Sequence, residues 1–164
     1  MKLTRTERWI LSNQFAILAA LYPDETEMYK EMRQVVDHGY EMSYEWISTH
    51  ISDDKDTMSE AECLEVLDIL GMFTAIKDTY NRLQDTSGIN DLWIKFIGFD
   101  GNNEGKFLGY THFLVEVQGK FPEIDHINSH APMLPGYRQM LAEWKQSKDR
   151  QNLTKDDLIR ITSK

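Results

Sequence analysis

His112 and Glu116 are the residues best suited by type and spacing to acid–base chemistry, and they lie in a block rich in aromatic residues. On a helix, side chains four positions apart share a face, so burial could shift both pKa values. Asp100 is a third candidate for a site assembled from scattered residues. A surface hydrogen bond explains the same spacing, and the nearby glycines match no nucleotide-binding pattern. We interpret the pair as structural, with an enzyme or ligand-binding site around it as the alternative.

A second cluster has the residue types of a metal site. The segment PEIDHINSHAP contains Glu123, Asp125, His126 and His130. Imidazole and carboxylate groups bind divalent transition metals. Prolines on both sides favour a loop, however, and no HExxH pattern occurs. We therefore predict a solvated polar loop and assign no metal, cofactor or catalytic residue.

Length and composition favour one globular domain. The chain has 164 residues, of which 41% are hydrophobic, and we expect a single domain over residues 1–164. No apolar run has the ~20 residues of a membrane helix, and the N-terminus lacks the apolar core of a secretory signal. The single cysteine, Cys63, cannot form an internal disulfide, and its helical apolar neighbours indicate a core position. We expect a cytoplasmic protein without membrane contact.

The net charge of −9 is unevenly distributed. Carboxylates crowd residues 24–68, whereas basic residues are in excess over 138–164. An acidic surface repels a phosphate backbone, so nucleic-acid binding is not expected. Unlike regions could meet head to tail in two copies, which predicts a homo-oligomer. The alternative is that the acidic face only keeps the protein soluble.

Helix signals recur along the chain. Capping boxes begin at Thr4 and Ser59, and Gly39 is suited to a left-handed helix end. The patterns predict helices that cover these stretches: 4–22, 24–39, 43–51, 59–84, 136–145 and a short one after Thr154. The helix at 59–84 is apolar on two faces, so we place it at the centre of the fold.

Residues 93–121 allow two interpretations. Apolar and polar side chains alternate over 107–121, which favours a strand. Gly101, Gly105 and Gly109 recur every four residues after an N-cap candidate, which favours a helix at 101–118 with a close-packed glycine face. The residues alone leave helix and hairpin open.

Two segments of the sequence carry a resemblance to a known family. The opening TERWILSNQF, with its ILSNQ, and the later GFD and LGY are similar to those of the YfbU family of bacterial proteins. The resemblance implies a multihelical fold and so decides for a helix at 101–118. We therefore expect an all-α protein of about seven helices, with an α+β fold carrying a hairpin in 93–121 as the alternative. The family has no assigned activity, so no functional residue is carried over.

The segment 44–73 has the spacing of a helix-turn-helix. Its second helix presents only carboxylates, which oppose DNA contact: Glu60, Glu62, Glu65 and Asp68. A regulatory nucleic-acid binder is therefore the weakest alternative.

Large aromatic side chains are the remaining lead. The tryptophans occur once in each region, as expected of core anchors, although interface anchors are the alternative: Trp9, Trp46, Trp93 and Trp144. Because catalytic motifs are absent, we expect a non-enzymatic protein that self-associates or binds a protein partner.

Overall fold

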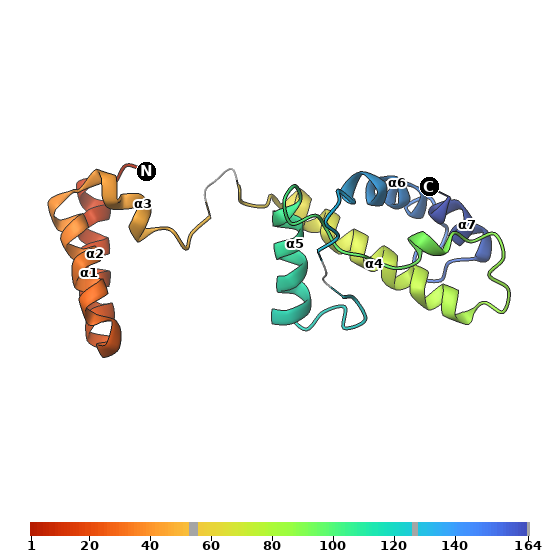
Figure 1. The fold of residues 1–164 in the computed structure, drawn as a ribbon, viewed down its shortest axis with the longest axis horizontal. Helices are drawn as coiled ribbons and strands as arrows, with labels where there is room; N and C mark the ends of the chain where they lie inside the picture. The colour runs from red at the N-terminus through yellow and green to blue at the C-terminus, as the bar shows by residue number, and fades with distance from the viewer. Residues whose placement is uncertain (53–55, 126–127, 164) are drawn as a thin grey trace. The chain divides into compact units, whose positions relative to one another are not determined.

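The computed structural model describes residues 1–52, 56–125 and 128–163. This part of the chain is helical and contains no strand, as predicted (Figure 1). Contacts group the chain into two compact units, residues 1–55 and 56–164, here called the first and second unit. Each unit is described by itself. The prediction of one domain over residues 1–164 stays a prediction.

The first unit is a helical hairpin with a short third helix. Its α-helices are α1 (Arg5–Leu21), α2 (Thr26–His38) and α3 (Tyr44–Ile47), with single 3-10 turns at Pro23–Glu25 and Glu41–Ser43. The capping box before α1 is confirmed, since the Thr4 hydroxyl accepts from the Glu7 amide at 3.2 Å. Gly39 ends α2 with φ 72°, as predicted.

The core of the first unit is small. α1 and α2 lie side by side (Figure 1), and the Thr26 hydroxyl ties their connection by donating to the Ala19 carbonyl at 2.8 Å. The buried apolar residues of this unit are Phe15, Val35, Val36, Tyr44 and Ile47. A hairpin of this size has too few elements to surround both of its helices.

The second unit is built around α4 (Glu60–Arg82), which confirms the central helix predicted at 59–84. Its partners are α5 (Gly105–His112), α6 (Leu134–Trp144) and α7 (Lys155–Thr162). α4 buries the following side chains: Val66, Ile69, Leu70, Met72, Phe73, Ala75, Ile76 and Thr79. Capping boxes begin both α4, at Ser59, and α7, at Thr154.

Aromatic rings fill the space between α4 and α6. The ring of Tyr137 lies 5.1 Å from Phe73, 5.5 Å from Phe96 and 5.6 Å from Phe99, between ring centroids. Its hydroxyl donates to the Gly98 carbonyl at 3.1 Å, which satisfies the buried oxygen. This cluster joins the loop before α5 to the centre of the unit.

Residues 93–121 correct two expectations. The hairpin alternative is wrong, because α5 continues into a π-helical turn at Phe113–Val117 and the loop before it forms only one isolated bridge, between Phe99 and Asn128. Leu108 and Leu114, which broke the alternation, pack on or in the core. The close-packed glycine face is wrong for Gly105 and Gly109, since a Cβ at either would meet nothing within 4 Å. Gly101 precedes α5, which begins at Gly105 rather than at 101, and a Cβ there would lie 2.6 Å from the side-chain nitrogen of Asn128.

Candidate interaction surface

The segment from Trp9 to Pro23 contains no charged residue, although most of it faces away from the core. It makes up most of α1, in which only Ser12 and Phe15 are buried. Exposed helix surfaces normally carry charged side chains. A helix that is apolar well beyond its buried stripe is typical of a surface that contacts another protein.

One exposed stripe runs along the free side of α1. Ile10, Ile17 and Leu21 are spaced by seven and four residues, so they share a helix face. Ile17 is 59% exposed, and the flanking Trp9 is 69% exposed. The stripe therefore presents branched aliphatic side chains and an indole ring to solvent, with the amide side chain of Gln14 beside it.

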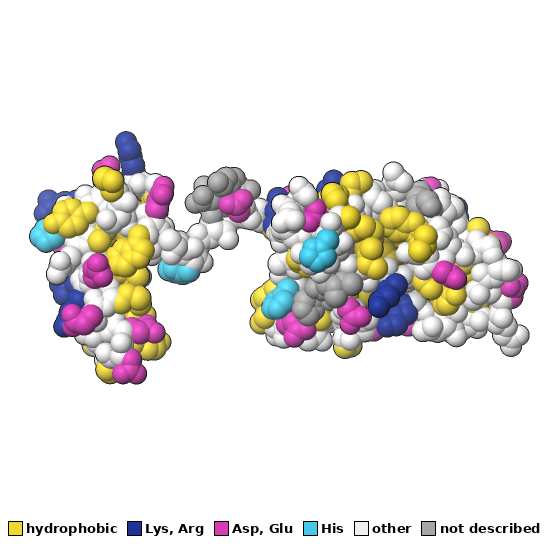
Figure 2. All heavy atoms as spheres, in the orientation of Figure 1, with side chains coloured by type: hydrophobic (Ala, Val, Ile, Leu, Met, Phe, Trp, Pro, Cys, Tyr) yellow, Lys and Arg dark blue, Asp and Glu magenta, His cyan; other side chains and the backbone are white. Residues whose placement is uncertain are grey.

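An apolar groove lies on the adjacent side of the hairpin. Its volume is about 550 Å³, and its walls come from both long helices and from the chain around α3. The apolar lining residues are Met1, Leu3, Leu11, Phe15, Leu18, Met28, Tyr29, Met32, Ile47 and Ile51. Figure 2 shows hydrophobic side chains gathered along the hairpin. Gln14 lines the groove, so groove and stripe together form one surface, here called the α1 face.

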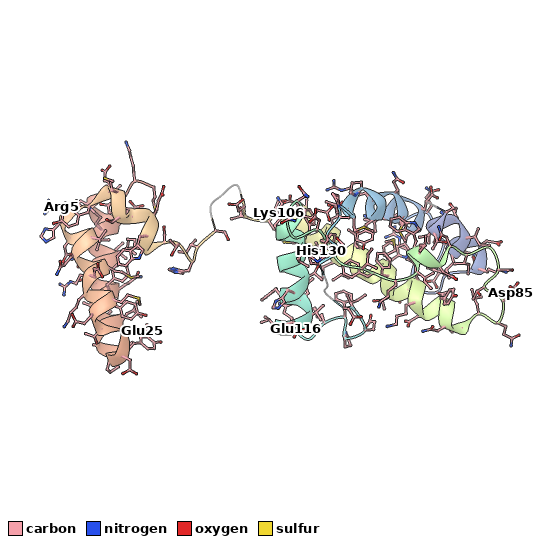
Figure 3. The ribbon with its side chains drawn as sticks, viewed as in Figure 1. Arg5, Glu25, Asp85, Lys106, Glu116 and His130 are labelled. Atoms are coloured by element: carbon pink, nitrogen blue, oxygen red, sulfur yellow. The ribbon has the colours of Figure 1, made fainter. Side chains whose placement is uncertain are left out.

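Charges mark the two ends of the α1 face. Arg5 lies at one end of the hairpin and Glu25 at the other (Figure 3). Lys2 accompanies the basic end, and Asp24 accompanies the acidic end. Within the described residues, neither Arg5 nor Asp24 has an ion-pair partner, although Glu25 accepts from the Tyr29 hydroxyl at 2.7 Å. The long apolar middle is thus bordered by opposite charges.

The acidic surface of α4 is different, because its carboxylates pair within the unit. Arg138 donates to both carboxylate oxygens of Glu65, at 2.7 and 2.9 Å, and Asp68 lies 2.6 Å from the Lys145 ammonium. A head-to-tail contact between copies was expected to use these two regions. Since the chain itself pairs part of them, they contribute less to any contact between copies.

Asp100 has a structural role in the turn before α5. Its side chain accepts from Asn103 and from the Asn102 amide at 3.0 Å, and these hydrogen bonds, Asn103 first, hold the pKa of the carboxyl below its usual range. His112 and Glu116 are exposed and do not line the groove. An enzyme or ligand site around them stays a prediction.

The predicted metal-type cluster is only partly described. His126 lies outside the described residues. Asp125 lies 3.6 Å from the Lys95 ammonium, and the Glu123 carboxylate accepts from the Thr74 hydroxyl. No group of three or more potential metal ligands occurs within residues 1–52, 56–125 and 128–163. Glu123 and Asp125 therefore make other contacts.

The structure also bears on the interpretations of the segment 44–73, of Cys63 and of the tryptophans. The helix-turn-helix considered at 44–73 spans both units, with α3 in the first and α4 in the second. Its two helices therefore do not belong to one compact unit. Cys63 is half-buried rather than part of the core. Trp144 is buried as predicted, but core anchoring is wrong for Trp9 and Trp46, which are exposed. The α1 face was not identified from the sequence, which was interpreted only as a helix at 4–22.

Fold and surface together define an all-α protein with one unusually apolar helix face. No helix among the described residues is long and apolar enough to cross a membrane. The family described as YfbU domain matches residues 1–163, so the chain belongs to the YfbU family.

Proposed function

We propose that this protein is a non-enzymatic interaction module that self-associates through the α1 face. The carrying observation is the charge-free run from Trp9 to Pro23, which forms a helix with only two buried residues. Interface cores are depleted in charge and enriched in aromatic residues and methionine, as this face is. The first unit also gains from a partner, because its own core is small.

A second copy is the occupant that the charges favour. If two α1 helices pack antiparallel about a two-fold axis, the Arg5 end of one copy meets the Asp24 end of the other. A parallel pair would bring like charges together at both ends. Two hairpins packed in this way form a four-helix bundle, the usual way for paired helices to bury their second apolar face.

The single cysteine also supports a cytoplasmic location, which belongs to the proposal. Cys63 is suited to a reducing compartment because it cannot form an internal disulfide. The net charge of −9 opposes nucleic acid as the partner.

Light scattering after size exclusion tests the proposal with a matched pair of variants. Ile17→Glu places a carboxylate in the middle of the α1 face, and Gln34→Glu adds the same charge on the exposed side of α2. We expect a dimer mass for the unchanged chain and for Gln34→Glu at micromolar concentration. Ile17→Glu should weaken association at least about tenfold, because a central apolar contact becomes a buried charge.

The outcomes separate the possible occupants. A monomer mass for the unchanged chain overturns self-association. If that monomer also loses thermal stability in Ile17→Glu but not in Gln34→Glu, the face is covered by the rest of the same chain. A dimer that persists equally in Ile17→Glu places the contact elsewhere and overturns the α1 face.

Charge reversal tests the antiparallel arrangement. Arg5→Glu and Asp24→Lys should each weaken the dimer a few-fold at low salt, since each places like charges opposite one another. The double variant should recover the affinity of the unchanged chain. In a parallel arrangement each reversed residue lies opposite the same residue of the second copy, so the double variant shows no recovery.

A further inference from the structure

A cavity of about 320 Å³ lies in the second unit beside the C-terminal half of α4. Its floor is apolar and buried, with Phe73 only 1% exposed and Phe96 and Ile124 also in the core. The two phenylalanine rings meet edge to face, with centroids 5.5 Å apart. Because the floor is almost fully buried, the apolar surface open to a ligand comes from Tyr80 and Ile94, which are half-buried. These two side chains offer an aromatic ring and an aliphatic surface to a planar apolar group.

The rim of this cavity is polar and carries a lysine whose charge is not neutralised. The Lys77 ammonium donates to the Glu123 carbonyl at 3.1 Å and has no carboxylate within ion-pair distance among the described residues. The Glu123 carboxylate, which also lines the cavity, accepts from the Thr74 hydroxyl and makes no ion pair with Lys77 in the described part of the chain. A neutral carbonyl leaves the positive charge of Lys77 free to attract an anion.

Three further polar side chains line the cavity, those of Asn81, Lys95 and Asp125. The Lys95 ammonium lies 3.6 Å from Asp125, and both side chains are 68% exposed, so this pair is weak and easily rearranged. The side-chain amide of Asn81 also lines the cavity and makes no hydrogen bond within the described part of the chain. It can therefore donate to a ligand oxygen without breaking an internal contact.

We infer that this cavity binds a small aromatic carboxylate, with the ring against Tyr80 and Ile94 and the carboxylate at Lys77 and Asn81. The volume is suited to one or two rings, since a cavity of about 150 Å³ holds benzene. One ammonium and one amide match a single carboxylate. A phosphoryl group has more oxygens than these two donors satisfy and is usually met by arginines or a helix N-terminus.

Amide chemical shifts of the full-length chain, titrated with 2-naphthoate, test the inference. The neutral 2-naphthalenemethanol, which has the same rings, is the ligand control. We expect saturable shifts at Asn81, Ile94 and Phe96, with a dissociation constant of about 1 mM or tighter. The alcohol should bind at least about fivefold more weakly, because it lacks the charge that Lys77 attracts. No saturable shift at these residues overturns the inference.

Matched variants locate the site. Lys77→Gln should weaken naphthoate binding about five- to tenfold, while Lys148→Gln, an exposed lysine elsewhere in the unit, should leave it unchanged. Asn81→Trp should abolish binding by filling the opening from the exposed side of α4. Equal binding by Lys77→Gln and the unchanged chain, or equal binding of alcohol and naphthoate, removes the carboxylate site. Ile17→Glu should bind naphthoate normally, because the cavity belongs to the second unit alone.

Discussion

The two units contain similar amphipathic helices but cover their apolar side chains to different degrees. Around α4, three helices and the loop before α5 surround the long central helix and bury most of its apolar residues. In the first unit, α2 and α3 cover one side of α1, and Ile10, Ile17 and Leu21 stay exposed. The exposed large apolar side chains of the described residues lie mostly in the smaller unit.

The two units also differ in how far their surface charges are paired. Two acidic side chains of α4 find basic partners on α5 and α6, with Glu62 paired to Lys106 and Glu65 to Arg138. α1 has no charge between Trp9 and Pro23, and the charges at its ends are not neutralised by each other. The second unit is therefore internally matched, whereas the first unit has the features of a surface that requires a partner.

The largest expected difference between the units is in the cost of removing a core ring. Phe73→Ala should lower the free energy of unfolding of the second unit by about 3–5 kcal/mol, because the dense aromatic cluster cannot close the cavity. Phe15→Ala should cost less, since its small cluster is open on the groove side and can relax. Urea unfolding followed by amide exchange in each unit measures both. Equal losses would show that the two cores are equally well filled.

If the α1 face binds a second copy, dilution should destabilise the first unit and leave the second unit unchanged. Each tenfold dilution above the dissociation constant lowers the free monomer concentration about threefold, since one dimer yields two copies, and so removes about 0.7 kcal/mol from the stability of each dimerised unit. Amide exchange in α1 and α2 should therefore accelerate about threefold, while exchange in the middle of α4 should not change. The Ile17→Glu variant should lose this concentration dependence. Exchange in α1 that is equally slow at all concentrations would contradict the proposed contact.

Local signals predicted the helices well, because their causes are local. Capping boxes at Thr4, Ser59 and Thr154 each begin a helix, and Gly39 ends one in the left-handed conformation. The 3.6-residue periodicity also identified α4 as central, since a helix that is apolar on two faces needs neighbours on both.

Features that depend on neighbours were not predictable in this way. The periodicity that predicts α1 does not reveal that the first unit has too few elements to cover its apolar side chains. The regular glycines at 105 and 109 suggested a close approach that no neighbour makes. The cavity beside α4 gathers side chains from three separate segments, so no local pattern marks it.

Two glycines of the second unit test how closely its interior is filled. A Cβ at Gly136 would lie 2.8 Å from the Trp93 ring, so Gly136→Ala should overpack α6 and cost about 1–3 kcal/mol. Gly109→Ala meets nothing within 4 Å and should stabilise α5 by about 0.5–1 kcal/mol through helix propensity. Thermal unfolding measures both. Destabilisation by Gly109→Ala would restore the close-packed glycine face.

The smallest expected effect concerns the paired surface charge of α4. The ammonium of Lys106, followed by the Ser59 amide, lowers the pKa of Glu62 from 4.5 to about 2. A carboxyl whose pKa is lowered in the folded state stabilises the fold above its unfolded pKa, and this contribution is lost as pH falls through the folded pKa. Glu62→Gln keeps an oxygen for the capping box but removes the charge that attracts Lys106. Urea unfolding of this variant should show a small, constant deficit above about pH 4.5, which disappears as pH approaches 2. Asp78→Asn, which removes an exposed carboxylate without an ion pair in the described residues, controls for changing a carboxylate of α4 to an amide. If the free energy of unfolding of Glu62→Gln stays low at pH 2, Glu62 stabilises α4 through packing. The contrast between paired charges on α4 and unpaired charges beside α1 would then have no energetic basis.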